Sequence, residues 1–296
     1  MIKRWGSQAI VFLMWLLHWL PLPLLAAIGE GVGALLWRLA GSRRKVVLKN
    51  LALCFPELDE AARRRLAREH FGAVARGFLE HSYLWFASEE RLLRMVRIEG
   101  DIHLAERTGR PVMWLLPHFV GLDYTAPALM LKQSKPAITI YQRQSNAVFD
   151  EALLKARGRF GQARLFDRQA GIRPVLRAIQ KEGAGFVNLP DMDFGTKDAA
   201  FVPFFGVPAA TLLAPARMAQ SMHMLVQPIV VTMLPRGQGY VVRFCEAPEG
   251  FDNPDLPQAA AAFNRWLEAR IREQPAQYYW VHRRFKTRPE GEAKIY

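Results

Sequence analysis

Short apolar runs of strand length alternate with amphipathic helical stretches through most of the chain. The runs are VMWLLP (112–117), AITIYQ (137–142), FVNLP (186–190), LVQPIVVTML (225–234) and YVVRFCE (240–246). Between them, residues 172–182 place apolar side chains at helical spacing, and the glycines of 183–185 end that helix. This alternation predicts an α/β fold with a mostly parallel central sheet flanked by helices.

The last two apolar runs differ from the others because only PRGQG (235–239) separates them. A connection this short joins antiparallel strands into a hairpin. The sheet is therefore expected to be mixed. Residues 60–80 and 257–274 show the periodicity of two further amphipathic helices.

Near the N-terminus, residues 9–28 are largely apolar and contain no formally charged side chain. At 1.5 Å per residue, a helix of this length is about long enough to cross a bilayer. The stretch predicts a membrane-anchor helix, and Pro21 and Pro23 favour a bent or partly interfacial form of it. A cleaved signal peptide and a buried core helix are the other interpretations of such a stretch.

Basic residues flank this stretch unevenly. Lys3 and Arg4 precede it, and a larger basic cluster follows it: Arg38, Arg43, Arg44, Lys45 and Lys49. The positive-inside rule places the heavier basic flank in the cytoplasm. We therefore expect residues 1–45 to form the anchor with its basic segment, and residues 46–296 to form one domain that faces the cytoplasm.

Composition narrows the class of protein further. The 296 residues carry a formal net charge of +13, with 51% hydrophobic and 23% charged residues, which excludes a disordered or fibrous protein. A basic surface suits nucleic acid, an acidic membrane or an acidic protein. Signatures of nucleic-acid recognition are missing from the sequence, and Cys54 and Cys245 stand too far apart for a metal or redox motif.

The segment WLLPHFVGLDYTAP (114–127) contains the principal candidate for chemistry. His118 directly follows an apolar run, and Asp123 comes five positions later. Across a strand-to-helix bend, the carboxylate of Asp123 can fold back onto the imidazole. Such a pair suits a general base, because the imidazole takes a proton from a hydroxyl while the carboxylate fixes its tautomer. The spacing alone does not distinguish this base from a packed histidine.

Two more polar residues, Arg143 and Asp191, follow apolar runs in the same way. In open α/β sheets, ligands bind beyond the carboxyl ends of the strands. The sequence therefore predicts a site at the sheet edge where His118, Arg143 and Asp191 lie.

The His-x4-acid spacing resembles that of the glycerolipid acyltransferase superfamily. Two longer segments, LPDMDFGTKDAAFVPFFGVPAAT (189–211) and PAQYYWVHRRFKTRP (275–289), are similar to the bacterial lipid A biosynthesis acyltransferases. These are inner-membrane enzymes that add secondary acyl chains to lipid A. The similarity extends from the N-terminal apolar stretch to about residue 290, so it implies a glycerolipid-acyltransferase-like fold.

The resemblance implies a reaction as well. An acyl group moves from acyl carrier protein to the hydroxyl of a 3-hydroxyacyl chain on a Kdo-bearing lipid A precursor, without metal or cofactor. His118 would be the base and Asp123 its orienting partner. The lack of a G-x-S-x-G elbow agrees with direct transfer. A lysophospholipid or another glycolipid as the acceptor, and hydrolysis by the same pair, are the alternatives.

Supporting residues also follow from the resemblance. Arg159 matches a family arginine and would bind a precursor phosphate or an oxyanion. Asp191, with Asp193 beside it, matches the family Pro-Asp and would orient that arginine. Arg143 is one position away from the usual arginine of the second strand, which leaves its role open. A solvated arginine and turn-capping aspartates are the plain alternatives.

Two further segments have both a structural and a functional interpretation. FVPFFGVPAAT (201–211) either packs a loop against the sheet or forms a wall of a hydrocarbon channel. The basic tail HRRFKTR (282–288) is either solvated or meets anionic headgroups or the acidic carrier protein.

Overall fold

The computed structural model describes residues 2–143, 145–161 and 163–296. Within these residues, seven strands form a central sheet in the order β1-β9-β8-β2-β5-β3-β4. The strands are β1 (Val96–Glu99), β2 (Val112–Leu115), β3 (Ala137–Tyr141), β4 (Ala163–Asp167), β5 (Gly185–Asn188), β8 (Leu225–Met233) and β9 (Tyr240–Phe244). Neighbouring strands pair in parallel, except that β8 and β9 are antiparallel. The predicted mixed, mostly parallel sheet is confirmed.

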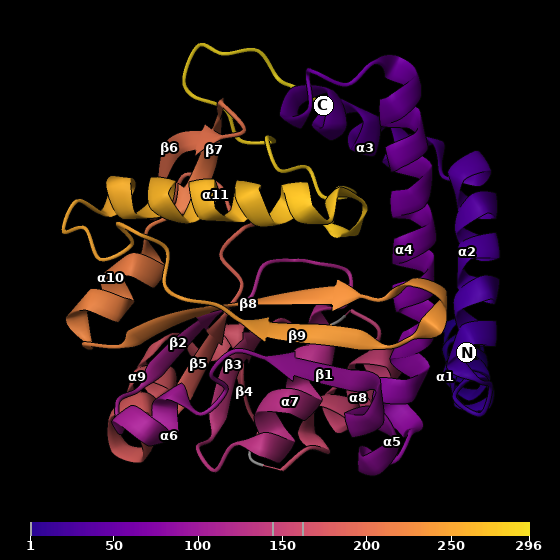
Figure 1. Ribbon diagram of the computed structural model, residues 1–296, viewed down its shortest axis with the longest axis horizontal. Coiled ribbons are helices and arrows are strands. Elements are labelled where there is room, and N and C mark those ends of the chain that lie inside the picture. Colours follow the sequence, from indigo (N-terminus) through magenta and orange to yellow (C-terminus); the bar gives the residue numbers. More distant parts are fainter. Residues whose placement is uncertain (1, 144, 162) are drawn as a thin grey trace.

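Helices surround this sheet and extend beyond one end of it. Their bounds are α1 (Ile2–Leu17), α2 (Leu22–Leu39), α3 (Gly41–Cys54), α4 (Glu60–Phe86), α5 (Glu89–Met95), α6 (Leu104–Thr108), α7 (Thr125–Lys132), α8 (Ala147–Gly158), α9 (Arg173–Glu182), α10 (Ala214–Ser221) and α11 (Leu256–Glu273). Figure 1 shows α11 over one side of the sheet, α7 and α8 on the other, and α2 and α4 upright at one end.

The five apolar runs correspond to β2, β3, β5, β8 and β9. The sequence did not reveal β1 and β4, which lie at the two edges of the sheet. Their side chains are mostly only partly buried, so they lack the continuous apolar pattern of a central strand. The sheet has a hydrophobic core on each face, and successive residues of β2 point into opposite ones. Met113 lies in one core, and Trp114 lies in the other, on the side of α7.

Residues 199–212 form a separate antiparallel hairpin, β6 (Ala199–Phe204) and β7 (Val207–Leu212). The hairpin packs against α11, and the ring of Phe204 is fully buried there. Of the two interpretations of residues 201–211, the structure therefore supports packing.

The N-terminal apolar stretch is divided between two helices at the prolines that favoured a bent form. The α1 helix ends at Leu17, and α2 begins after Pro21. Proline lacks a backbone N–H and clashes with the preceding turn, but it is tolerated in the first turn of a new helix. Among the described residues, one helix, α2, is long and apolar enough to cross a membrane.

The N-terminal helices expose an unusual amount of apolar surface. The exposed large side chains here are Trp5, Ile10, Phe12, Leu13, Trp15, Leu16, Trp19, Leu24, Ile28, Val32, Leu35, Leu36 and Leu39. Apolar surface of this extent is typical of a membrane or protein contact.

The opposite side of α2 packs tightly along α4, as Figure 1 shows for the two helices. A Cβ atom added at Gly29 would lie 2.5 Å from Cα of Arg76, and one added at Gly33 would lie 2.5 Å from Cα of Gly72. The two glycines therefore allow a backbone approach that no larger residue permits.

Replacing Gly33 with alanine is expected to destabilise the fold by about 1–3 kcal/mol, because the new methyl group would overlap the α4 backbone. Gly31→Ala is the matched control, since nothing lies within 4 Å of a Cβ atom there. This control should stabilise α2 by roughly 0.5–1 kcal/mol. Thermal unfolding in detergent measures both variants, and equal melting temperatures would contradict the close packing.

Candidate active site

The carboxyl ends of β2 and β5 bring His118 and Asp191 together. In this parallel pair Leu115 lies opposite Asn188, so the residues three positions further along each chain also meet. Nδ1 of His118 lies 2.7 Å from Oδ1 of Asp191, and the backbone N–H of His118 donates to Oδ2 at 2.9 Å. These two contacts fix both the position and the rotation of the imidazole.

The surroundings of the pair orient the imidazole and leave its Nε2 open to a substrate. Asp191 is fully buried, whereas 20% of the His118 side chain is exposed. Burial opposes the charge of Asp191, but the nearby positive charge and hydrogen bonds of His118 outweigh it and lower the pKa of Asp191. A carboxylate facing Nδ1 holds the proton there, and Nε2 has no hydrogen-bond partner among the described residues.

The predicted contact between Asp123 and His118 is wrong. Asp123 lies in the short 3₁₀ helix η1 (Leu122–Tyr124), which begins directly after Gly121 and turns the carboxylate toward α4 and α8. Oδ2 of Asp123 lies 2.8 Å from Nε2 of His81, and Oδ1 lies 3.2 Å from Nη2 of Arg157. We call these three side chains the Asp123 cluster.

The Asp123 cluster is a network of charges. Nδ1 of His81 lies 2.6 Å from the carbonyl oxygen of Gly77, so both ring nitrogens of His81 face acceptors. Burial opposes the charge of His81, but the hydrogen bond and negative charge of Asp123 outweigh it and raise the pKa of His81. Burial likewise opposes the charge of Asp123, and the charges of Arg157 and His81 lower its pKa. An imidazolium and a guanidinium therefore hold the Asp123 carboxylate.

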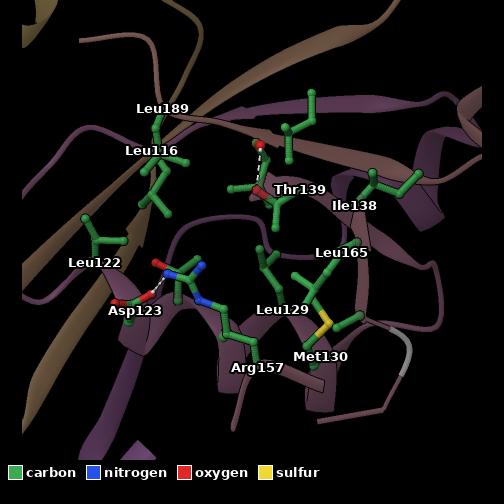
Figure 2. Close-up of a pocket in the computed structure, with 16 residues that line it drawn as sticks. Leu116, Leu122, Asp123, Leu129, Met130, Ile138, Thr139, Arg157, Leu165 and Leu189 are labelled. Carbon is green, nitrogen blue, oxygen red and sulfur yellow. Dashed lines mark hydrogen bonds and ion pairs between the residues drawn. The ribbon is translucent and has the colours of Figure 1, made fainter. Parts of the chain in front are cut away.

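An apolar pocket of about 140 Å³ lies between the sheet and α7, next to this cluster. Its lining begins near the catalytic edge with Leu116, Leu122 and Leu189, and it reaches the starts of β3 and β4 at Ala137 and Ala163. Figure 2 shows Asp123 and Arg157 joined at one side of the pocket, among leucines. A mainly apolar lining with a few polar groups is typical of a site that binds a hydrocarbon group.

Arg159, which the family resemblance placed on a phosphate or an oxyanion, instead contacts the end of α4. Its Nη1 donates to the carbonyl of Leu84 at 3.1 Å, and its Nη2 donates to the carbonyl of Ala87. The last carbonyls of a helix lack partners within the helix, and a guanidinium satisfies them well. The prediction that Asp191 orients Arg159 is wrong, because both Asp191 oxygens face His118.

Asp193 connects the loop that carries Asp191 to the C-terminal tail. Its carboxylate accepts hydrogen bonds from the backbone and the hydroxyl of Thr287, both at 2.7 Å, and from the backbone of Gly195 at 3.0 Å. The Asp193 N–H donates to Nε2 of His282 at 3.0 Å, and burial lowers the pKa of that histidine to about 4. Asp193 therefore caps the turn at Gly195, as the plain alternative predicted, and it also binds the C-terminal tail through Thr287.

Arg143 lies at the predicted sheet edge, but its ion-pair partner is Asp167 and not a residue of the His118 pair. It is 68% exposed and forms an ion pair with Asp167 at 2.6 Å, across the ends of β3 and β4. In the tail, Arg284 is buried and donates to the carbonyl of Ala210 at 2.7 Å, so this part of the basic run is not solvated.

The structure also adds residues that the sequence did not single out as functional. His81 was not among the candidates from the sequence, and Arg157 stands two positions before Arg159, which was. In the described part of the chain, no group of three or more His, Cys, Asp or Glu side chains could hold a metal ion.

A mixed α/β sheet with a histidine–carboxylate pair beside an apolar pocket defines a protein equipped for acid–base chemistry on a substrate with a hydrocarbon chain. Comparison with known proteins identifies the family. The sequence model of the bacterial lipid A biosynthesis acyltransferases matches residues 1–287. The chain therefore belongs to this family and is an acyltransferase of lipid A biosynthesis, which confirms the resemblance of residues 189–211 and 275–289.

Individual members of the family are similar to this chain along most of their length. The lipid A biosynthesis lauroyltransferase of Escherichia coli strain K12 is 30% identical over 98% of this chain and 94% of the relative. The lipid A biosynthesis palmitoleoyltransferase of the same strain is 30% identical over 99% of this chain and 95% of the relative. A lipid A biosynthesis acyltransferase of Haemophilus influenzae is 32% identical over 92% of this chain and 87% of the relative.

Proposed function

We propose that the protein transfers an acyl chain from acyl carrier protein to the hydroxyl of a 3-hydroxyacyl chain on a Kdo-bearing lipid A precursor. The observation that carries this proposal is the His118–Asp191 pair, with Nε2 free among the described residues, beside an apolar pocket. Membership in the family supports the lipid A precursor as the acceptor.

In the proposed reaction, Nε2 of His118 takes the proton of the acceptor hydroxyl as its oxygen attacks the thioester carbonyl. The tetrahedral intermediate then expels the carrier thiolate, and the imidazolium returns the proton to the sulfur. The Asp191 carboxylate keeps the other proton on Nδ1 and stabilises the imidazolium. No covalent acyl-enzyme forms, so no nucleophilic serine or cysteine is required.

The apolar pocket would hold the hydrocarbon chain of the donor. It begins beside the turn that carries His118 and continues under the sheet, where no charged residue except Asp123 and Arg157 lines it. The Asp123 cluster would hold that turn against α4 and α8. The exposed Arg143 would contribute to binding of the acidic carrier protein, and Arg159 would fix the end of α8 that carries Arg157.

The N-terminal helices would place this site at the cytoplasmic face of the bacterial inner membrane. Their outward surface is apolar, and α2 is followed by the basic residues Arg43, Arg44, Lys45 and Lys49. Basic residues next to a membrane helix remain in the cytoplasm and attract anionic headgroups. Acyl carrier protein would then reach the site from the cytoplasm.

Mass spectrometry of lipid A from a deletion strain tests the proposal. We expect lipid A that lacks one secondary acyl chain, and recovery of this chain when the wild-type gene is restored. An unchanged acylation pattern would exclude lipid A as the acceptor and would favour a lysophospholipid or another glycolipid. Release of free fatty acid by the purified protein, without acylation of the precursor, would instead show a hydrolase.

A further inference from the structure

An apolar groove runs along α8 from α1 to the Asp123 cluster. Its outer part, of about 290 Å³, lies between α1, the end of α4 and α8. Apart from the charged Glu151 and Lys155, the residues that line this outer part are apolar: Val11, Trp85, Phe86, Val148, Ala152 and Ala156. Its inner part is a narrow cavity of about 20 Å³, lined by Leu84, Leu153 and Phe160 together with the three cluster residues. Trp85 and Ala156 line both parts, so the two parts adjoin.

At its inner end, the groove meets the apolar pocket. Asp123, Ala126 and Arg157 line both cavities, so the Asp123–Arg157 ion pair stands between them. From Val148 to Arg157 the groove follows ten residues of α8, which is about 14 Å at a rise of 1.5 Å between successive residues. The outer part has room for a hydrocarbon segment, and the narrow inner part leads from it to the Asp123 cluster.

At its outer end, the groove opens beside the apolar surface of α1. Val11 lines the groove, while the neighbouring Phe12 and the ring of Trp15 are exposed. A hydrogen bond of 2.6 Å from Nδ2 of Asn146 to Oγ of Ser7 ties α1 to the start of α8. The α1 helix is therefore a fixed wall of the groove, with its exposed side available to the bilayer.

We propose that this groove binds an acyl chain of the membrane-borne acceptor lipid, and that the Asp123–Arg157 ion pair separates this chain from the donor chain in the apolar pocket. The inference rests on the proposed function. According to this inference, Ala152 and Ala156 contact the acceptor chain. Asp123, the acid of the His-x4-acid motif, lies between the groove for the acceptor chain and the apolar pocket for the donor chain.

The chemistry of the acceptor explains why its chain occupies the groove. The hydroxyl to be acylated is carried by a hydrocarbon chain, so part of that chain must leave the bilayer when the hydroxyl reaches His118. An apolar path that begins at a membrane-facing helix keeps the chain out of water. The donor arrives on a soluble carrier and has no need of an opening at α1.

Ala152→Phe tests the proposal, with Ala147→Phe as the matched control. Both residues lie on α8, but Ala152 lines the groove, whereas Ala147 is exposed and does not line it. For Ala152→Phe we expect the KM for the lipid A precursor in mixed micelles to rise roughly tenfold or more, a typical effect of blocking an apolar subsite. The KM for acyl carrier protein substrate should stay within about twofold of wild type.

Val11→Trp, which narrows the groove from α1, should raise the same acceptor KM, so the test does not depend on one variant that folds poorly. An unchanged acceptor KM in both variants, or a rise mainly in the donor KM, would overturn the proposal. Failure of the proposed function is distinguishable, because the wild-type protein itself would then not acylate the precursor.

Discussion

Replacement of His118 by alanine is expected to reduce acyl transfer by about 10³-fold or more, since a positioned general base contributes roughly 10²–10⁴-fold. The loss should appear in kcat, because the imidazole acts on the hydroxyl as it attacks and contributes little to binding of the ground state. Transfer is measured with acyl carrier protein substrate and lipid A precursor, and the same variant should fail to restore the missing chain in a deletion strain.

Two further variants separate chemistry from structure at this position. His118→Asn keeps an N–H group near the place of Nδ1, so it retains a donor for Asp191 but has no base, and it should be as inactive as the alanine variant. His103→Ala removes an exposed histidine that pairs with Glu106 and has no contact with the His118–Asp191 pair, so this variant should keep activity. Substantial transfer by His118→Asn would contradict the role of His118 as the base.

The periodicity of the sequence was sufficient to predict the architecture. Central strands are apolar along their whole length, as in β2, or most of it, as in β8, because both faces are covered, and this pattern is visible without a structure. The edge strands β1 and β4 and the hairpin of residues 199–212 were missed. Their side chains are mostly only partly buried, so they lack a continuous apolar pattern, and β1 pairs with a strand distant in the sequence.

The location of the site was also predictable, but the pairing within it was not. His118 and Asp191 were both placed at strand ends, and each follows a Leu-Pro dipeptide: LPH at 116–118 and LPD at 189–191. Only the order of strands shows that β2 and β5 are neighbours, with Leu115 opposite Asn188. Sequence proximity favoured Asp123 instead, and the direction of its side chain depends on contacts with α4 and α8.

Asp191→Asn is expected to reduce kcat by about 10³–10⁴-fold, the scale observed when a carboxylate that orients a catalytic histidine becomes an amide. Its amide oxygen can still accept from the His118 backbone, but the amide N–H₂ group then faces Nδ1. The imidazole would respond by carrying its proton on Nε2, where the lone pair of the base is needed.

Asp123→Asn provides the comparison, because it weakens contacts to His81 and Arg157 and leaves the tautomer of His118 unaffected. We therefore expect a smaller loss than in Asp191→Asn. Both variants are measured by the kcat of acyl transfer under the same conditions. A larger loss in Asp123→Asn than in Asp191→Asn would return the orienting role to the acid of the His-x4-acid motif.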